Sequence, residues 1–218
     1  MINHAATFVP WIVYENLVLM MQRRRATLSG APLTRIELAD RLNDHEYAVI
    51  DGVRTDDPHD PRPGAVINIV LIAPGSKYAT KSMDFNKLFK SLPKQSTQRQ
   101  EIIFVSELDM TPHIKRHIHV HRSAYTNIFI EDYSYDIFKI DAPSHSLVPP
   151  HIVMTEAEVE ELCSRNKTNR KYFPQILHTD PQAVWLGLQP GMCVKILRVS
   201  ETAGTAVAYR YCVKNTSA

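Results

Sequence analysis

Residues 65–72 read AVINIVLI, and this β-branched run predicts a strand. Two further runs of the same kind follow at residues 101–105 and 126–130. Segments of helical character at residues 82–92 and 112–125 separate the three runs. Strand, helix, strand, helix, strand is the order of an α/β layered domain, and right-handed crossovers would make part of its sheet parallel. The sequence therefore predicts an N-terminal α/β domain with a mixed sheet.

The predicted domain ends at a proline. A fourth strand is expected over residues 135–140, and Pro143 marks the exit from it. We therefore expect two domains, residues 1–143 and residues 144–218. Within the first, residues 55–64 read TDDPHDPRPG, whose prolines and aspartates disfavour both helix and strand and predict an exposed loop.

The N-terminal segment predicts helices rather than a targeting signal. Residues 10–22 have apolar side chains at helical spacing, and the basic run after them stands on the wrong side for a secretory signal. The segment is also too short and too polar to span a membrane. A second helix is expected around residues 34–42, where Thr34 and Glu37 form a capping-box pair. The apolar stripe expected on the first helix consists of Trp11, Tyr14, Val18 and Met21.

The C-terminal domain is expected to combine a helix with a β-hairpin. A short strand at residues 152–154 precedes Thr155, which caps a helix with Glu158 at its third position. Two alternating runs, residues 193–199 and 207–213, flank a loop that ends in glycine and favour antiparallel pairing. We therefore predict a small α+β C-terminal domain with an antiparallel hairpin.

Charge and cysteine content exclude several classes of protein. The formal net charge is +2: residues 1–143 carry 17 basic and 17 acidic side chains, and residues 144–218 carry 8 and 6. Neither domain is a polycation, so contact with nucleic acid would need a local basic patch within a larger assembly. The three cysteines are widely spaced and form no C-x-x-C pair, which disfavours a disulfide framework and fits a reducing intracellular compartment.

The sequence offers no catalytic centre and no cofactor site. The G-x-S-x-G, G-x-x-x-x-G-K-[ST] and G-x-G-x-x-G motifs are all absent. His113 and His117 have the i, i+4 spacing of metal ligands, but no H-E-x-x-H motif and no nearby third ligand accompanies them. We therefore expect no metal, and we interpret His113, His117, His119 and His121 as a solvated helix face.

The segment Thr111–Tyr125 predicts a capped basic helix. It contains no acidic residue, and its basic residues are Lys115, Arg116 and Arg122. Thr111 is a favourable N-cap and Pro112 a favoured first helical residue. A helix N-terminus with basic side chains one turn on can hold a phosphate without reading base sequence. On these residues alone, DNA contact and an ordinary solvated surface both stay open.

Ordered motifs fill the C-terminal domain and continue upstream. The C-terminal motifs are HSLVPPH at 145–151, Met154-Thr155, Asp180-Pro181, Gly187, Pro190-Gly191, VKI at 194–196, Arg198, SETAG at 200–204 and Tyr209-Arg210. Upstream, Trp11 lies in a predicted helix, and IIFV at 102–105 precedes Met110-Thr111-Pro112. In this order the chain resembles the fifth-largest subunit shared by eukaryotic nuclear DNA-directed RNA polymerases. Its C-terminal domain resembles the smaller archaeal counterpart of that polymerase component.

The resemblance implies a non-catalytic structural subunit, present once per polymerase, nuclear and not membrane-bound. It implies a C-terminal assembly domain that docks on the largest subunit and an N-terminal jaw domain near downstream duplex DNA. The implied docking residues are His145, Pro149, His151, Arg198, Ser200, Glu201, Thr202, Ala203, Gly204 and Arg210. The DNA-proximal residues are Thr111, Pro112, His113, Lys115 and Arg116.

Departures from the family pattern suggest a narrower role. His113 and Ile114 follow Thr-Pro where the family usually has small residues, and Val199 stands where a proline is usual. We hypothesise a divergent copy dedicated to one polymerase, such as polymerase I, which would place it in the nucleolus. The jaw domain, which archaeal relatives lack, implies a eukaryotic or eukaryote-derived viral origin. The alternative is a free-standing DNA-binding or nuclease-like factor, which would bind DNA alone with a steep salt dependence.

Overall fold

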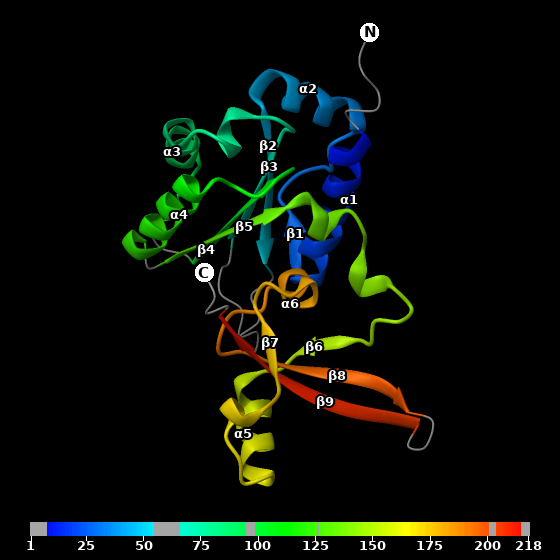
Figure 1. Cartoon of the computed structure of the whole chain (residues 1–218). Coiled ribbons are helices and arrows are strands. Elements are labelled where there is room, and N and C mark those ends of the chain that lie inside the picture. Colours follow the sequence, from blue (N-terminus) through cyan, green and yellow to red (C-terminus); the bar gives the residue numbers. More distant parts are fainter. Residues whose placement is uncertain (1–7, 55–65, 95–98, 126, 201–203, 215–218) are drawn as a thin grey trace. The chain divides into compact units, whose positions relative to one another are not determined.

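The computed structural model describes residues 8–54, 66–94, 99–125, 127–200 and 204–214 (Figure 1). Contacts divide the chain into two units, of which the first reaches Ile140 and the second starts at Asp141. The domain border predicted after Pro143 lies three residues further along, and the loop predicted at residues 55–64 lies outside the described residues. No helix in these ranges is long and apolar enough to cross a membrane.

Within the described residues, five strands of the first unit form one mixed sheet. Its order is β1–β2–β3–β4–β5, with bounds Ala26–Leu28, Tyr47–Arg54, Val66–Ile72, Gln100–Ser106 and Ile128–Ser134. β1, β2 and β3 pair antiparallel, whereas β3, β4 and β5 pair parallel. The predicted mixed sheet is therefore confirmed, but β1 and β2 have no counterpart among the predicted strands.

Helices cover both faces of this sheet. α3 (Ser82–Ser91) and α4 (Pro112–Ala124) lie side by side on one face, where they pack against Ile102 and Ile130 (Figure 1). α1 (Phe8–Arg23) covers the opposite face. Side chains alternate along β4, so Glu101 and Ile102 point to opposite faces of the sheet. Arg24, which directly follows α1, contacts Glu101, so α1 lies on the face opposite to α3 and α4.

The buried stripe of α1 agrees with the prediction in part. Tyr14 and Met21 are buried as predicted, whereas Trp11 and Val18 are only half-buried. Val13, Leu17 and Met20, which were not predicted, are fully buried. These three keep helical spacing, and Arg24 continues the stripe one turn after Met20. Arg24 therefore lies on the buried side of the chain, where its side chain reaches the carboxylates of Glu101 and Glu131.

Residues 135–140 do not form the predicted strand. Tyr135–Phe138 is a 3-10 helix, and the side chains of Tyr135 and Phe138 are fully buried. Their i, i+3 spacing places them on one side of a helical turn, whereas a strand would point them to opposite faces. The Tyr135 hydroxyl also donates a hydrogen bond to the Ile72 carbonyl oxygen, which ties the turn to β3.

Both predicted capping boxes are confirmed. At the start of α2 (Arg35–His45), the Glu37 N–H donates to Thr34 Oγ1 at 3.3 Å, and the Thr34 N–H donates to the Glu37 carboxylate at 2.8 Å. The same pair of bonds joins Thr155 and Glu158, at 3.2 and 2.8 Å. Each box satisfies backbone donors that would otherwise have no partner within the helix.

Gly52 of β2 occupies a position with no room for a side chain. An added Cβ would lie 2.0 Å from Met21 Cε and 2.9 Å from the carbonyl oxygen of Thr27. The methionine end can move, but the Thr27 oxygen belongs to β1, which pairs with β2 at this point.

We expect Gly52→Ala to lower the unfolding free energy of the first unit by about 1–3 kcal/mol, because the added methyl group strains a packed sheet. Urea unfolding measures this change. The matched control is Gly30→Ala, whose Cβ would meet no atom within 4 Å and which should change stability by less than about 0.5 kcal/mol. Equal unfolding midpoints for the two variants would contradict the expectation.

The described part of the second unit holds a four-stranded mixed sheet. Its order is β6–β8–β9–β7, with bounds His151–Val153, Cys193–Ser200, Gly204–Val213 and Gln175–Leu177. β8 and β9 form the predicted antiparallel hairpin, and β7 pairs parallel with β9. The helices are α5 (Glu156–Arg165), which was predicted, and α6 (Pro181–Leu186), which was not. The second unit also has 3-10 turns at Ala142–Ser144 and Arg170–Tyr172, and the first unit has a further one at Lys77–Ala79.

Candidate functional site

Four of the predicted docking residues line one pocket of the second unit, which we call the arginine pocket. Its volume is about 200 Å³. The predicted residues in its wall are Pro149, His151, Arg198 and Arg210. The remaining lining residues are Ile176, Asp180, Gln182 and Ile196. The fold therefore brings together residues that are widely separated in the sequence.

Strand register explains why these side chains meet. His151 of β6 pairs with Ile196 of β8, and Arg198 stands two residues further along β8. Arg210 of β9 pairs with Val194 of β8. Paired residues point to the same face and side chains alternate along a strand. His151, Arg198 and Arg210 therefore share one face of the sheet.

The start of α6 supplies two polar residues of the pocket wall, Asp180 and Gln182. Asp180 is the N-cap, and its carboxylate accepts a hydrogen bond from the Gln182 N–H at 2.8 Å. Pro181 is the first helical residue, and Gly187 ends the helix with a positive φ of 69°. Asp-Pro is a sequence signal for a helix start. Ile176 and Gln182 carry no comparable signal, and sequence reasoning missed them.

The tautomer of His151 is fixed by a neighbouring carbonyl group. His151 Nδ1 lies 2.6 Å from the Pro149 oxygen, and a carbonyl oxygen can only accept. Nδ1 therefore carries a hydrogen. In the neutral ring the other nitrogen, Nε2, is then an acceptor, and in the protonated ring it becomes a second donor.

The arginine pocket has surplus positive charge. Arg210 Nη1 donates to the Gln175 carbonyl oxygen at 3.1 Å, which anchors that side chain, while Arg198 is exposed. Asp180 is the acidic residue in the wall. Among the described residues, no ion pair joins Arg198 or Arg210 to a carboxylate, whereas Arg170 of the same unit pairs with Glu156. An anionic group is the natural complement of this wall.

The other predicted docking residues lie apart from the pocket wall or outside the described residues. His145 is exposed, and its Nδ1 accepts a hydrogen bond from the Leu147 N–H at 3.2 Å. Ser200 and Gly204 are the last pair of the β8–β9 hairpin. Gly204 has a φ of +70°, a conformation that glycine adopts readily. The side chain of Ser200 lies outside the described part of the structure. Glu201, Thr202 and Ala203 lie outside the described residues.

In the first unit, the predicted DNA-proximal residues stand at the start of α4. Thr111 occupies the N-cap position with extended backbone, and Pro112 is the first helical residue, as predicted. The expectation that the Thr111 side chain caps the helix is wrong. Its hydroxyl forms no capping bond, and in the described chain the buried Oγ1 has no hydrogen-bond partner. The hydroxyl is thus withdrawn from the N–H groups of the first turn.

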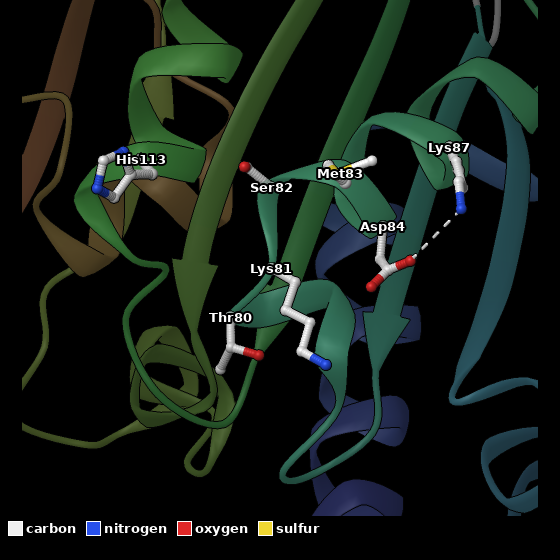
Figure 2. A pocket seen from close by; sticks show the side chains of 7 residues that line it. All are labelled: Thr80, Lys81, Ser82, Met83, Asp84, Lys87 and His113. Carbon is white, nitrogen blue, oxygen red and sulfur yellow. Dashed lines mark ion pairs between the residues drawn. The ribbon is translucent and has the colours of Figure 1, made fainter.

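Charges around the start of α4 are mixed. Lys115 Nζ lies 3.9 Å from the Asp109 carboxylate, and Arg116 Nη2 lies 3.3 Å from His113 Nδ1. His113 also lines an open pocket of about 410 Å³ (Figure 2). The rest of that pocket comes from the start of α3: Thr80, Lys81, Ser82, Met83, Asp84 and Lys87. The surface is therefore basic only locally.

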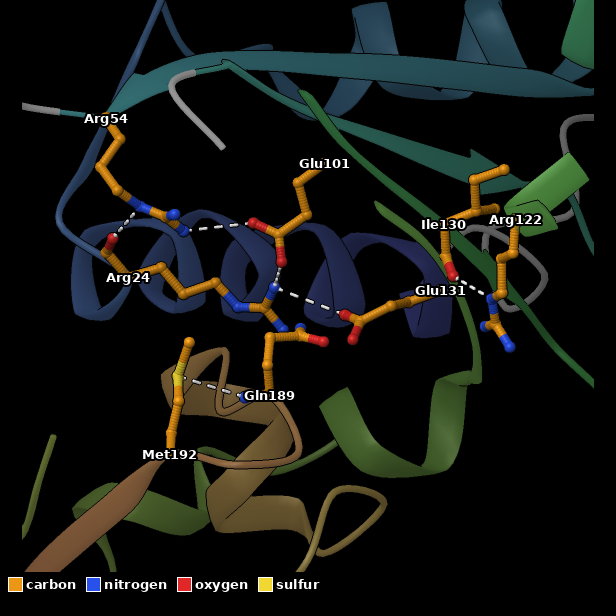
Figure 3. Close-up of polar contacts among 8 residues, drawn as sticks. All are labelled: Arg24, Arg54, Glu101, Arg122, Ile130, Glu131, Gln189 and Met192. Carbon is orange, nitrogen blue, oxygen red and sulfur yellow. Dashed lines mark hydrogen bonds and ion pairs between the residues drawn. The ribbon is translucent and has the colours of Figure 1, made fainter. Parts of the chain in front are cut away.

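Arg122 turns away from this surface. Its Nε donates to the Ile130 carbonyl oxygen (Figure 3). Its Nη2 lies 3.5 Å from the Asp132 carboxylate. Burial raises the pKa of Asp132, and the positive charge of Arg122 opposes that shift. Arg122 therefore fastens α4 to β5.

Two of the histidines pack between helices, which corrects the expectation of a solvated face. The Asn86 amide bridges them, since its Nδ2 lies 3.2 Å from His117 Nδ1 and its Oδ1 lies 3.1 Å from His121 Nε2. The His121 ring also stacks on Phe89, with ring centroids 4.1 Å apart. Within the described ranges, no group of three or more His, Cys, Asp or Glu side chains is arranged to hold a metal ion. These imidazoles join α4 to α3.

We expect the first unit to lose stability as the pH falls below about 6.5, the ordinary histidine pKa. Burial is the main cause that lowers the pKa of His121, and His117, Lys94 and Lys90 lower it further. The unfolded chain therefore takes up this proton more readily than the folded chain. The contribution of neutral His121 is present above the unfolded pKa and is lost as the pH falls through it.

Urea midpoints measured between about pH 7 and about pH 5 test this expectation. The midpoint of His121→Phe, which keeps a ring against Phe89 but cannot titrate, should fall less than that of the unmodified chain. His119→Gln, at an exposed position of the same helix, is the matched control. If His121→Phe and the unmodified chain show the same fall, the assignment to His121 is wrong.

Sequence reasoning missed a buried ionic cluster, which consists of Arg24, Arg54, Glu101 and Glu131 (Figure 3). Arg24 Nη1 contacts Glu101 Oε1 and lies 3.6 Å from Glu131 Oε2. Arg54 Nη2 lies 3.1 Å from Glu101 Oε2, and its Nε donates to the Arg24 carbonyl oxygen at 2.9 Å. Burial raises the pKa of Glu101, while Arg24 and Arg54 act against that shift. A glutamate inside a β-branched run was the available sequence signal.

Comparison with known proteins extends over both units. Residues 140–212, which include the whole arginine pocket, match the family model described as RNA polymerase Rpb5, C-terminal domain. A DNA-directed RNA polymerase RPB5 homolog from African swine fever virus is 30% identical over 152 residues, which cover 69% of this chain and 74% of the relative.

Cellular relatives match over shorter stretches. The DNA-directed RNA polymerases I, II, and III subunit rpabc1 of Dictyostelium discoideum is 36% identical over 116 residues, covering 53% of this chain and 58% of the relative. The corresponding RPABC1 subunit of Caenorhabditis elegans is 38% identical over 122 residues, covering 55% and 56%. Together with the viral relative, these matches show that the chain belongs to the RPB5 family of DNA-directed RNA polymerase subunits.

Proposed function

We propose that the chain is a non-catalytic subunit that docks on the largest subunit of its RNA polymerase through the arginine pocket. The observation that carries this proposal is the convergence of Pro149, His151, Arg198 and Arg210 on one wall. Each of these residues also belongs to a motif that carries the family resemblance. A concave site with a few convergent polar groups is the default place for binding.

The non-catalytic role rests on the sequence, which lacks the nucleophile and phosphate-loop motifs of enzymes. The polymerase reaction belongs to other subunits of the complex. This chain then contributes structure, as one copy per polymerase, in the nucleus. If it is dedicated to polymerase I, it is concentrated in the nucleolus.

Affinity purification of the tagged full chain from its source cells tests the docking proposal. Mass spectrometry should identify the largest polymerase subunit at equal stoichiometry. Separate purification of each nuclear polymerase tests dedication to one of them, because the chain would then occur in one preparation and not in the others. A chain that stayed monomeric in cell extract would overturn the docking proposal.

We further propose that the first unit forms a jaw beside downstream duplex DNA, with contact at the start of α4. The exposed side chains of Lys115 and Arg116 support this placement, and the segment 111–125 has no acidic residue. The nearby Asp109 and the balanced charge of residues 1–143 limit the strength of the contact. The larger subunits then hold most of the DNA.

Lys115→Gln and Arg116→Gln should each weaken DNA retention by the assembled polymerase by only about 1 kcal/mol. Retention measured over a range of salt concentrations should also show a shallower salt dependence. Lys139→Gln, which removes an equally basic side chain elsewhere on the first unit, is the control. A much larger loss, or tight DNA binding by the isolated chain, would favour the free-standing DNA-binding factor.

A further inference from the structure

The size of the arginine pocket restricts its occupant. Its volume of about 200 Å³ is below the range of about 300–1,000 Å³ that small-molecule and cofactor sites occupy. A cavity of this size suits one inserted side chain rather than a nucleotide or a folded peptide. Its wall combines apolar Ile176 and Ile196 with polar groups from β6, β8, β9 and α6.

The two arginines line the same pocket from neighbouring strands. Arg198 and Arg210 lie on one face of the β8–β9 hairpin, as the pairs Arg198↔Ala206 and Val194↔Arg210 require. On that face of β9, Ala206 and Ala208 stand between the two positions, and their small side chains put no bulk there. Guanidinium groups that approach one site from two strands can each donate to the same anion.

Two other residues of the wall already form hydrogen bonds within the chain. The Asp180 carboxylate accepts from the Gln182 N–H, and the His151 Nδ1 hydrogen is donated to Pro149. One donor of Arg210 is used by the Gln175 carbonyl oxygen, but a guanidinium has five N–H donors. A guanidinium that makes one such bond therefore still has donors to offer to a bound anion.

We infer that the arginine pocket receives the carboxylate of one Asp or Glu side chain of the partner polymerase subunit. This inference rests on the proposed docking function and specifies its chemistry. A carboxylate matches the forked donors of arginine, and it suits a proteinaceous partner where a phosphate would not. This contact fixes how the two chains align, while the surrounding surface supplies most of the area buried on docking.

Affinity measurements with charge-neutralised full-length chains test the inference. The probe is the purified largest subunit of the polymerase with which the chain co-purifies. Arg198→Gln and Arg210→Gln should each weaken binding by about 30-fold or more, because each leaves the partner carboxylate with one guanidinium fewer. Arg165→Gln, an exposed arginine at the end of α5 in the same unit, should change binding less than about 2-fold. Melting curves of all variants verify that they fold.

A zero-length carbodiimide cross-link identifies the occupant directly. In Arg198→Lys the introduced amine should form an amide with the bound carboxyl group, with loss of water to the reagent. Peptide mass spectrometry should then join position 198 to one Asp or Glu of the partner. Arg165→Lys, treated in parallel, should give no such product.

The outcomes separate this inference from the docking proposal. Binding of the unmodified chain with no loss in Arg198→Gln and Arg210→Gln overturns the carboxylate inference and leaves docking intact. A cross-link that returns to an acid of this chain, such as Asp180, also overturns it. Failure of the unmodified chain to bind the largest subunit overturns docking, and the inference with it.

Discussion

Glu101→Gln is expected to lower the unfolding free energy of the first unit by about 3–5 kcal/mol, the usual effect of removing one member of a buried ion pair. Glu101 is almost fully buried and contacts both Arg24 and Arg54. A neutral amide has nearly the same shape but cannot balance two guanidinium charges. The large effect arises because Arg24 stays buried, with 0% of its surface exposed.

Hydrogen exchange in increasing denaturant measures this effect in each unit separately, because peptides from the two units are resolved. Peptides from β4 and β5 should lose protection early, whereas those from β8 and β9 should not change. Glu107→Gln is the matched control, since this glutamate is exposed just after β4 and should alter stability by less than about 0.5 kcal/mol. A similarly small effect of Glu101→Gln would mean that the cluster contributes little.

Trp185→Ala is expected to destabilise the second unit by about 3–5 kcal/mol. Trp185 has 0% of its surface exposed and lies on the short helix α6. Removal of the indole leaves a cavity that a six-residue helix, held at one end by Asp180, cannot close without moving. Because Asp180 and Gln182 also line the arginine pocket, the same change should weaken docking.

Hydrogen exchange in increasing urea also measures this loss of stability, now in peptides of the second unit. Tyr172→Ala removes another large aromatic side chain of that unit, but one that is 82% exposed, so it should have an effect within about 0.5 kcal/mol. Equal losses in the two variants would show that α6 does not hold the core of the unit. Loss of docking without loss of stability would also contradict the expectation.

Local signals explain which elements the sequence could predict. Thr155 and Glu158 are three positions apart, and their bonds involve no other part of the chain, so the start of α5 was predictable. β2 was not predictable, because Asp51 and Gly52 are residues that strands disfavour. Contacts with residues that are distant in the sequence accommodate both of them in the strand. The Asn68 side chain donates to Asp51, and the β1 backbone occupies the space beside Gly52.

The candidate site likewise combines residues that the sequence could predict with residues that it could not. Arg198 and Arg210 belong to motifs with fixed spacing, and a resemblance was enough to select them. Ile176 and Gln182 enter the wall only through the positions of β7 and α6, which no local pattern sets. The buried role of Arg24 was hidden for a similar reason, since a basic run after a helix ordinarily predicts solvent exposure.

The buried ionic cluster also has a consequence for rates. Its members stand on β2, β4 and β5 and directly after α1, and Arg24 and Glu101 are 77 positions apart in the sequence. Contacts that join so many distant segments are expected to form after the folding transition state. Interactions absent from the transition state act mainly on the unfolding rate. The cluster is therefore expected to raise the kinetic barrier to unfolding of the first unit.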